Sequence, residues 1–310
     1  MNIPLPDGNL IDLDRPLIMG VLNVTPDSFS DGGAHDRPEA AIARARAMVE
    51  AGADLIDIGG ESTRPGAEPV SAEQQCRRVL PVIEQLSELL SRGEPGAGGV
   101  HISIDTSDAD VAGAAMDAGA AIVNDVTAGR GDGRMLPLAA TRGWPVILMH
   151  MQGTPRTMQD EPRYGDVVAE VRSFLIERCD AAVAAGIAPS RLVLDPGIGF
   201  GKTYDHNMAL LAGLEKFTSL DQPILVGVSR KRALGRACQL AEQERLGRAV
   251  EALRPDQLDG ATAGVTAMAV AAGVRILRVH EVGINRQAAD TAWQICKAAG
   301  SLPWRVTGCL

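Results

Sequence analysis

The chain has 310 residues, within the usual range of one α/β barrel, and 45% of them are hydrophobic while only 3% are aromatic. A net charge of −9 excludes the basic surface that a nucleic-acid or anionic-membrane partner requires. The five cysteines show no metal-binding spacing, and the first residues lack a signal pattern, so a soluble, cytoplasmic protein is expected.

Residues 1–15 predict a short N-terminal hairpin that turns at Asp7-Gly8 and could plug the bottom of a barrel. Apolar strands and helical segments then alternate. The expected strands are 17–22, 54–58, 100–104, 120–123, 145–149, 192–194, 223–228 and 274–277. The expected helices are 37–51, 72–90, 107–118, 133–141, 166–185, 205–217, a broken region over 233–272, and 287–299.

The strands are mostly continuous apolar runs, as is typical of parallel strands covered on both faces. Eight such units favour a (βα)8 TIM barrel, with residues 1–310 as a single domain. An open doubly wound sheet is the alternative, but it does not need eight evenly spaced units.

The stretch 191–203, RLVLDPGIGFGKT, shows how such a unit builds a site. Three apolar residues end on the carboxylate of Asp195, and Pro196 then stops the strand because it has no N–H to donate. Glycines at 197, 199 and 201 let the following backbone turn sharply and approach a ligand.

Most of the other predicted strands also end on, or just before, polar side chains. In a barrel these ends meet at one mouth, where active sites lie. So many polar and charged side chains in one place indicate a functional site. The residues are Asn23, Glu61, Asp105, Asn124, His150, Asp195, Ser229, Lys231, Arg278 and His280.

Parts of this pattern are also compatible with three other kinds of site. Residues 196–203 approximate a phosphate-binding P-loop, but Pro196 occupies the place of the first glycine. Lys231 at a strand end could form a Schiff base, with Arg230 and Arg232 lowering its pKa. A zinc site lacks ligand spacing, whereas Mg²⁺ needs only one or two protein oxygens when a phosphorylated substrate supplies others.

Long motifs along nearly the whole chain resemble the dihydropteroate synthase family. They are LIMGVLNVTPDSFSDGG (17–33), GADLIDIGGESTRPGA (52–67), ISIDTS (102–107), IVNDV (122–126), VILMHMQGTPRTMQ (146–159), LVLDPGIGFGKT (192–203), LVGVSRK (225–231) and ILRVHEV (276–282). The resemblance implies a homodimeric barrel enzyme. It would condense 6-hydroxymethyl-7,8-dihydropterin diphosphate with p-aminobenzoate, giving 7,8-dihydropteroate and pyrophosphate with Mg²⁺.

The resemblance also implies roles for individual residues. The implied pterin pocket consists of Asp105, Asn124, Asp195 and Lys231, lined by Met149, Gly199 and Phe200. The implied diphosphate and metal site consists of Asn23, Arg64, Arg278 and His280, with Asn23 as the metal ligand. The implied p-aminobenzoate site consists of Asp27, Phe29, Ser30, Asp31, Thr63, Arg64, Pro65, Ser229 and Lys231, and the catalytic set of Asn23, Asp31, Arg64, Lys231, Arg278 and His280.

The chemistry of these residue types agrees with that assignment. One carboxylate, such as Asp195, can accept two adjacent N–H donors from a pterin edge, and arginines bind diphosphate oxygens bidentately. The arylamine is already a neutral nucleophile, so no strong base is needed.

Two alternatives on the same barrel are a pterin-dependent methyltransferase and a non-catalytic pterin-binding paralogue. The first should lack the NVTPDSFSD loop and the second should have lost Asn23, Asp31 or Arg64, yet all are present. Residues 236–258 look about a dozen residues longer than the family pattern. They are expected to form a helical extension outside the active site, with Leu240, Leu246, Val250 and Leu253 near one face.

Overall fold

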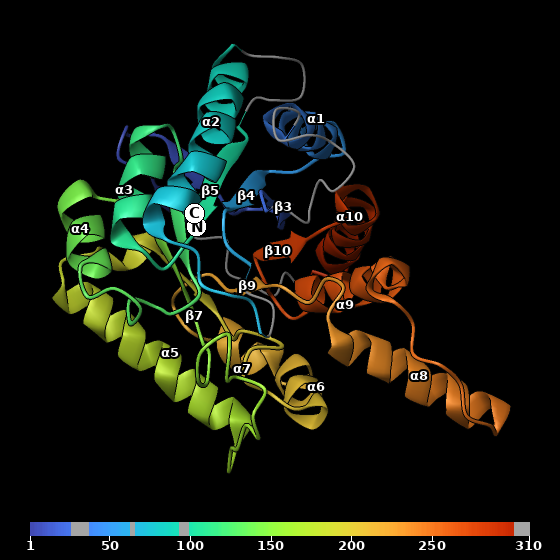
Figure 1. The fold of residues 1–310 in the computed structure, drawn as a ribbon. Helices are drawn as coiled ribbons and strands as arrows, with labels where there is room; N and C mark the ends of the chain where they lie inside the picture. The colour runs from blue at the N-terminus through green and yellow to red at the C-terminus, as the bar shows by residue number, and fades with distance from the viewer. Residues whose placement is uncertain (26–36, 63–65, 93–98, 301–310) are drawn as a thin grey trace.

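The computed structural model describes residues 1–25, 37–62, 66–92 and 99–300, and within them it forms a parallel eight-stranded sheet (Figure 1). The strands lie in the order β8-β7-β6-β5-β4-β3-β10-β9, and the parallel bridge between Leu194 and Ile224 joins the two ends of the sheet. The predicted barrel is therefore confirmed. Its strands are β3 (Leu17–Asn23), β4 (Leu55–Gly59), β5 (His101–Asp105), β6 (Ile122–Asp125), β7 (Val146–Met149), β8 (Leu192–Asp195), β9 (Leu225–Val226) and β10 (Ile276–Val279).

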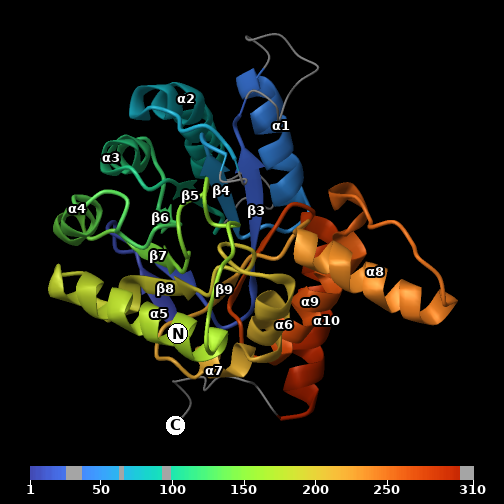
Figure 2. The same cartoon turned by 60° about the horizontal axis from the view of Figure 1, so that its bottom comes forward.

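The helices surround this barrel, which Figure 2 shows from a second direction. They are α1 (Arg37–Glu50), α2 (Ala72–Ser91), α3 (Ala109–Asp117), α4 (Met135–Arg142), α5 (Val167–Ala184), α6 (Tyr204–Ala212), α7 (Leu214–Thr218), α8 (Arg232–Leu246), α9 (Asp259–Ala271) and α10 (Val282–Ala298), with short 3₁₀ turns η2 (Pro189–Arg191) and η3 (Pro255–Gln257). Within the described residues, no helix is both long and apolar enough to cross a membrane.

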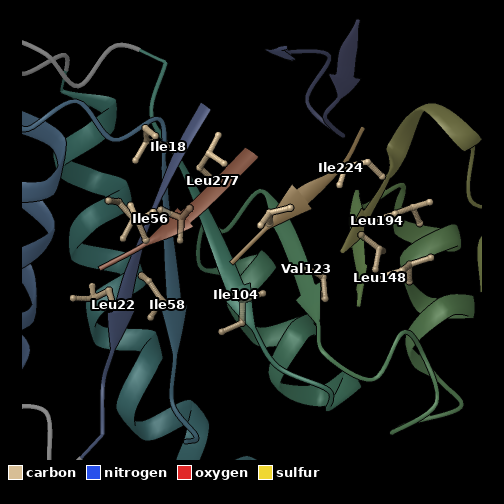
Figure 3. Close-up of a cluster of buried hydrophobic side chains, with 14 of the residues drawn as sticks. Ile18, Leu22, Ile56, Ile58, Ile104, Val123, Leu148, Leu194, Ile224 and Leu277 are labelled. Atoms are coloured by element: carbon tan, nitrogen blue, oxygen red, sulfur yellow. The ribbon is translucent and has the colours of Figure 1, made fainter. Parts of the chain in front are cut away.

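The strands bury apolar side chains on both faces, which explains their continuous apolar sequences. Residues such as Ile56, Ile58 and Leu194 pack outward against the helices (Figure 3). Leu55 and Val193, at alternate positions, pack inward into a second cluster. Each fully buried side chain of this kind contributes about 1.5–3 kcal/mol by its removal from water.

The inward cluster is closed from below by the N-terminal hairpin, β1 (Asn2–Pro4) and β2 (Leu10–Asp12). Asp7 starts its turn by accepting a hydrogen bond from the backbone N–H of Asn9 (2.9 Å). Ile3 and Leu13, both fully buried, pack against the lower ends of the barrel strands. The predicted plug is thus confirmed, and the floor of the barrel is apolar.

Several strand and helix ends shift by one or two residues, and three elements differ further in length, division or starting point. β9 covers only two residues of the predicted 223–228, and the predicted helix 205–217 is divided at Gly213 into α6 and α7. Helix α10 begins at Val282 rather than at 287, despite the weak helix propensity of Gly283. Its first turn is fixed because buried Val282 packs beside Gly20 of β3 and the Asn285 side chain accepts a hydrogen bond from Thr266 of α9 (2.7 Å).

The prediction that 236–258 is helical is wrong for its second half. Helix α8 ends at Leu246 because Gly247 takes the left-handed conformation (φ +66°), where glycine has no steric penalty. Residues 247–254 return beside the helix without helical structure, and the Gln239 side chain donates to the carbonyl of Val250 (2.8 Å). Both views show α8 extending away from the barrel (Figures 1 and 2).

Candidate active site

The register of the strands brings three of the predicted residues into one row at the carboxyl end of the barrel. Asn23 on β3 pairs with Gly59 on β4, Gly59 with Asp105 on β5, and Asp105 with Asn124 on β6. A Cβ atom on Gly59 would lie 3.5 Å from Cβ of Asp105 and 3.8 Å from Oδ1 of Asn23. The row is therefore continuous, and the glycine leaves space between its two polar neighbours.

Arg278 crosses from β10 to this row and is held by two carboxylates. Its Nε donates to Asp57 (2.6 Å) and one terminal nitrogen donates to Asp105 (2.7 Å). Desolvation raises the pKa of Asp105 to about 7, an effect that Arg278 opposes and the carboxylate of Asp57 reinforces. The carboxylates of Asp57 and Asp105 raise the pKa of Arg278 against the effect of burial, so its positive charge is permanent.

Lys231 and Asp195 face the other half of the mouth. Desolvation lowers the pKa of Lys231 to about 8, while Asp195 opposes that change. Burial raises the pKa of Asp195, and its Oδ1 accepts a hydrogen bond from the N–H of Gly197 (2.7 Å). Lys231 donates to the carbonyl of Ile198 and its Nζ lies 4.6 Å from the centre of the Phe200 ring.

The conformation of the loop after β8 depends on its glycines, and two of them show why. A Cβ atom on Gly197 (φ +67°) would lie 1.9 Å from the carbonyl oxygen of His150, and one on Gly199 (φ +87°) would lie 3.0 Å from Cδ of Lys231. The glycines that the sequence singles out thus bring the loop backbone against β7 and the Lys231 side chain.

Lys202 lies behind this loop instead of facing the mouth. Its buried Nζ donates to the carbonyls of Gly197 (2.8 Å) and Phe200 (2.9 Å) and lies 2.9 Å from Nδ1 of His150. Burial lowers the pKa of Lys202 well below its usual value. Desolvation, and to a smaller extent the nearby Lys202, lowers the pKa of His150 to about 3. Because its donors point at backbone carbonyls, Lys202 is not the phosphate-binding lysine of a P-loop.

An apolar wall stands beside the polar groups. Met149 packs with Val126, Met151 and Met158 in a small buried cluster, and Phe200 packs against it. Such a wall suits the flat face of a heterocycle whose edge meets the carboxylates.

Ser229 and His280 tie the ends of two neighbouring strands together. The Ser229 hydroxyl oxygen accepts from the backbone N–H of His280 (3.1 Å) and lies 2.9 Å from its Nδ1. Their pairing places both at the same end of the barrel as Arg278.

Two polar strand-end residues do not belong to the mouth. Glu61 accepts from the N–H of Val70 (3.0 Å) and from the Gln75 side chain (3.2 Å), so it fixes its own loop against α2. His150 is buried beside Lys202 and packs edge-on to Phe174. The implied residues Asp27, Phe29, Ser30, Asp31, Thr63, Arg64 and Pro65 lie outside the described residues.

Sequence reasoning missed Asp57, Met151 and Met158. Asp57 is not at a strand end, and the only signal for it is a charged residue within the apolar run LIDIG. The methionines follow β7 in a polar loop, where their burial could not be anticipated. Within the described part of the chain, no group of three or more His, Cys, Asp or Glu side chains is arranged to hold a metal.

Barrel and mouth together define a pterin-binding barrel enzyme, and the family model described as pterin binding enzyme matches residues 19–280. Dihydropteroate synthase of Escherichia coli K12 is 45% identical over 275 residues, covering 89% of this chain and 90% of its own. The Yersinia pestis dihydropteroate synthase, solved with a sulfonamide drug complex, has a TM-score of 0.83 at 40% identity and covers 96% of this chain and 100% of its own.

A further solved structure is the Xanthomonas albilineans dihydropteroate synthase with 4-aminobenzoic acid. It has a TM-score of 0.81 at 44% identity and covers 96% of this chain and 99% of its own. The chain belongs to the dihydropteroate synthase family. Because the chain belongs to this family, its site is not interpreted further as an ATP-binding, Schiff-base or methyltransferase site.

Proposed function

We propose that the mouth binds 6-hydroxymethyl-7,8-dihydropterin diphosphate with Asp105, Asn124, Asp195 and Lys231 on the pterin edge. The observation that carries this assignment is that the buried Asp195 and the half-buried Asp105 and Lys231 stand beside the apolar wall of Met149 and Phe200. A polar heterocycle replaces the lost hydration of those groups, and its ring covers the wall.

Arg278, His280 and Asn23 are proposed to receive the diphosphate, together with Arg64. Arg278 has a permanent charge and is held at Nε and one terminal nitrogen, so its other terminal nitrogen is available for a phosphate oxygen. The amine of p-aminobenzoate attacks the methylene carbon of the pterin, the C–O bond breaks, and pyrophosphate leaves with that oxygen. The amine proton passes to solvent, and the products are 7,8-dihydropteroate and pyrophosphate.

The p-aminobenzoate site is proposed to combine Lys231 and Ser229 with residues of the two loops that precede α1 and α2. Those loop residues are Asp27, Phe29, Ser30, Asp31, Thr63, Arg64 and Pro65. Catalysis then depends on positioning the amine and stabilising the leaving group rather than on a strong base.

Mg²⁺ fits this site through the carboxamide oxygen of Asn23, which stands at one end of the row of Asn23, Asp105 and Asn124. One hard oxygen ligand suits a magnesium ion that takes its other ligands from phosphate and water. When bound, the ion neutralises charge on the departing diphosphate.

A cytoplasmic homodimer is proposed as the working form. Helices α9 and α10 pack side by side and expose Met268 (66%) and Ile295 (64%) on the surface. Large apolar side chains exposed to this degree are favoured at interfaces between subunits.

The proposed pterin site is tested with Asp195→Asn, which replaces an acceptor-only group by one that also donates. The affinity for unphosphorylated 6-hydroxymethyl-7,8-dihydropterin, measured by calorimetry, is expected to fall by about 2–4 kcal/mol, while pyrophosphate affinity stays unchanged. The exposed Asp221→Asn is the control. Unchanged pterin affinity in Asp195→Asn removes this residue from the pocket.

A further inference from the structure

The middle of β4 carries one charged side chain, and it is fully buried. Asp57 pairs in register with Val21 on β3 and Ser103 on β5, one row below the row of Asn23, Asp105 and Asn124. It has no exposed surface, so it lies beneath the groups proposed to touch substrate. Burial of a carboxylate at this depth does not help core packing, because an aliphatic side chain would avoid its desolvation.

A single oxygen of Asp57 makes all of its hydrogen bonds. Oδ2 accepts from Nε of Arg278 (2.6 Å) and from Nδ2 of Asn124 (3.1 Å). Oδ1 is buried with no partner, and the hydroxyl of Ser103 at the register-paired position also has none in the described residues. Asp57 therefore joins a residue proposed to hold the diphosphate to a residue proposed to hold the pterin.

The orientation of the Arg278 guanidinium depends on the carboxylates of both Asp57 and Asp105. Asp57 takes Nε, and Asp105 on the adjacent strand takes one terminal nitrogen, so two points fix the plane of the guanidinium. Without Asp57, one hydrogen bond to Asp105 would remain, and the guanidinium could rotate about it. Asn124 would at the same time lose the acceptor that fixes which of its amide atoms faces the pocket.

We propose that Asp57 is a positioning residue that aligns Arg278 with the diphosphate and Asn124 with the pterin through its one bonded oxygen. This inference rests on the proposed function. It assigns Asp57 no contact with substrate.

The unpaired Oδ1 makes Asp57→Asn a sharp test. The carboxamide oxygen can take the place of Oδ2 and keep both hydrogen bonds, while its NH₂ takes the place of the unpartnered Oδ1. Asp57→Ala removes the acceptor altogether. Asp57→Ala is expected to lower kcat/KM for the pterin diphosphate about 100-fold, and Asp57→Asn to restore it to within about tenfold of wild type.

The double variant with Arg278 separates positioning from a structural role. Adding Asp57→Ala to Arg278→Ala should reduce kcat/KM by far less than the roughly 100-fold loss of Asp57→Ala alone, because the effect through Arg278 is already lost and only the effect through Asn124 remains. The KM for p-aminobenzoate should change little in Asp57→Ala. Ser103→Ala, which removes the neighbouring unpaired hydroxyl, is the matched control and should behave as wild type.

Full additivity of the two alanine substitutions, or wild-type activity in Asp57→Ala, would overturn the proposal. If Asp57→Ala does not fold, Asp57→Ser replaces it, because its hydroxyl is too short to reach Nε of Arg278. Failure of the proposed function itself has a different signature. The wild-type enzyme would then release no pyrophosphate when p-aminobenzoate is added, before any variant is compared.

Discussion

The pKa values of an acidic and a basic group at the mouth lie close together near neutral pH, because burial shifts them in opposite directions. Desolvation raises the pKa of Asp105 to about 7 and lowers that of Lys231 to about 8. Each group is also stabilised in its charged form by neighbours of opposite sign, Arg278 for Asp105 and Asp195 for Lys231. Both groups are therefore charged together only within a narrow interval of pH.

The affinity for unphosphorylated 6-hydroxymethyl-7,8-dihydropterin is expected to be highest at about pH 7–8. Below that interval Asp105 takes up a proton and stops accepting hydrogen bonds, and above it Lys231 loses its charge. Calorimetric titrations from acid to alkaline pH measure this profile. Lys231→Arg should abolish the alkaline decline, and Asp105→Asn should weaken the acid one, which Asp195 still supports because burial raises its pKa as well. A flat profile in the wild type would refute the assignment.

The sequence located these residues by a simple rule, that inward-facing side chains at the carboxyl ends of barrel strands share one mouth. The rule found Asp105, Asn124 and Asp195 because each one ends, or nearly ends, its strand. It included Glu61, which instead fixes a loop, and overlooked Asp57. Which way a side chain turns beyond the last paired residue depends on packing that no single strand encodes.

Among the elements, the loop between β8 and α6 is held by side chains that bond its backbone on the side away from the mouth. Lys202 binds two of its carbonyls, and Tyr164 donates to a third, that of Gly201 (2.7 Å). The Asn207 side chain accepts from the N–H of Gly199 (2.7 Å). These hydrogen bonds fix the positions of Phe200 and Gly199 relative to the mouth.

Lys202→Met should lower the free energy of unfolding by about 2 kcal/mol, since buried carbonyls lose their donors while the cost of burying the charge is relieved. Pterin affinity should fall by about tenfold or more as the loop loosens. Urea unfolding and calorimetry measure the two effects. The exposed Lys216→Met is the control, expected within about 0.5 kcal/mol of wild type; an equally small effect at Lys202 would contradict its role.

Helix α8 shows how periodicity misled the sequence reading. Leu246, Val250 and Leu253 continue a helical spacing across Gly247, so the apolar pattern outweighed the glycine. In the structure that glycine ends the helix, and the Leu246 and Leu253 side chains remain 40% and 37% exposed.

Removal of residues 240–249 should leave the active site intact. The cut joins Gln239 to Val250, which are already hydrogen-bonded, and removes a segment that projects away from the barrel (Figure 1). The KM values for both substrates should stay within about twofold of wild type in steady-state assays. A large rise in either value would show that the segment reaches the mouth.

For the whole molecule, the apolar surface on α9 and α10 determines the expected assembly. Met268→Glu should weaken the proposed dimer at least about tenfold, because a charge would be buried in the interface. Sedimentation velocity across a concentration series measures this change. Val183→Glu on α5, an exposed position on another helix, should have no effect, and equal behaviour of the two variants would contradict this interface.

The short strand β9 has a consequence for how the barrel responds to its substrate. Most barrel strands pair with their neighbours over three to five positions, whereas β8 meets the segment of β9 through the Leu194–Ile224 bridge, flanked by the bond from the Leu194 N–H to Pro223 (3.0 Å). Asp195 and Lys231 stand on opposite sides of this seam. A pterin bound by both residues would connect the two strands and stabilise a junction that has few backbone hydrogen bonds.

Hydrogen exchange of the Leu194 amide should therefore slow markedly on pterin binding. The amide of Val123, which donates to the carbonyl of Pro145 between β6 and β7, should change far less. Equal protection at both amides would mean that the seam opens only with the rest of the barrel.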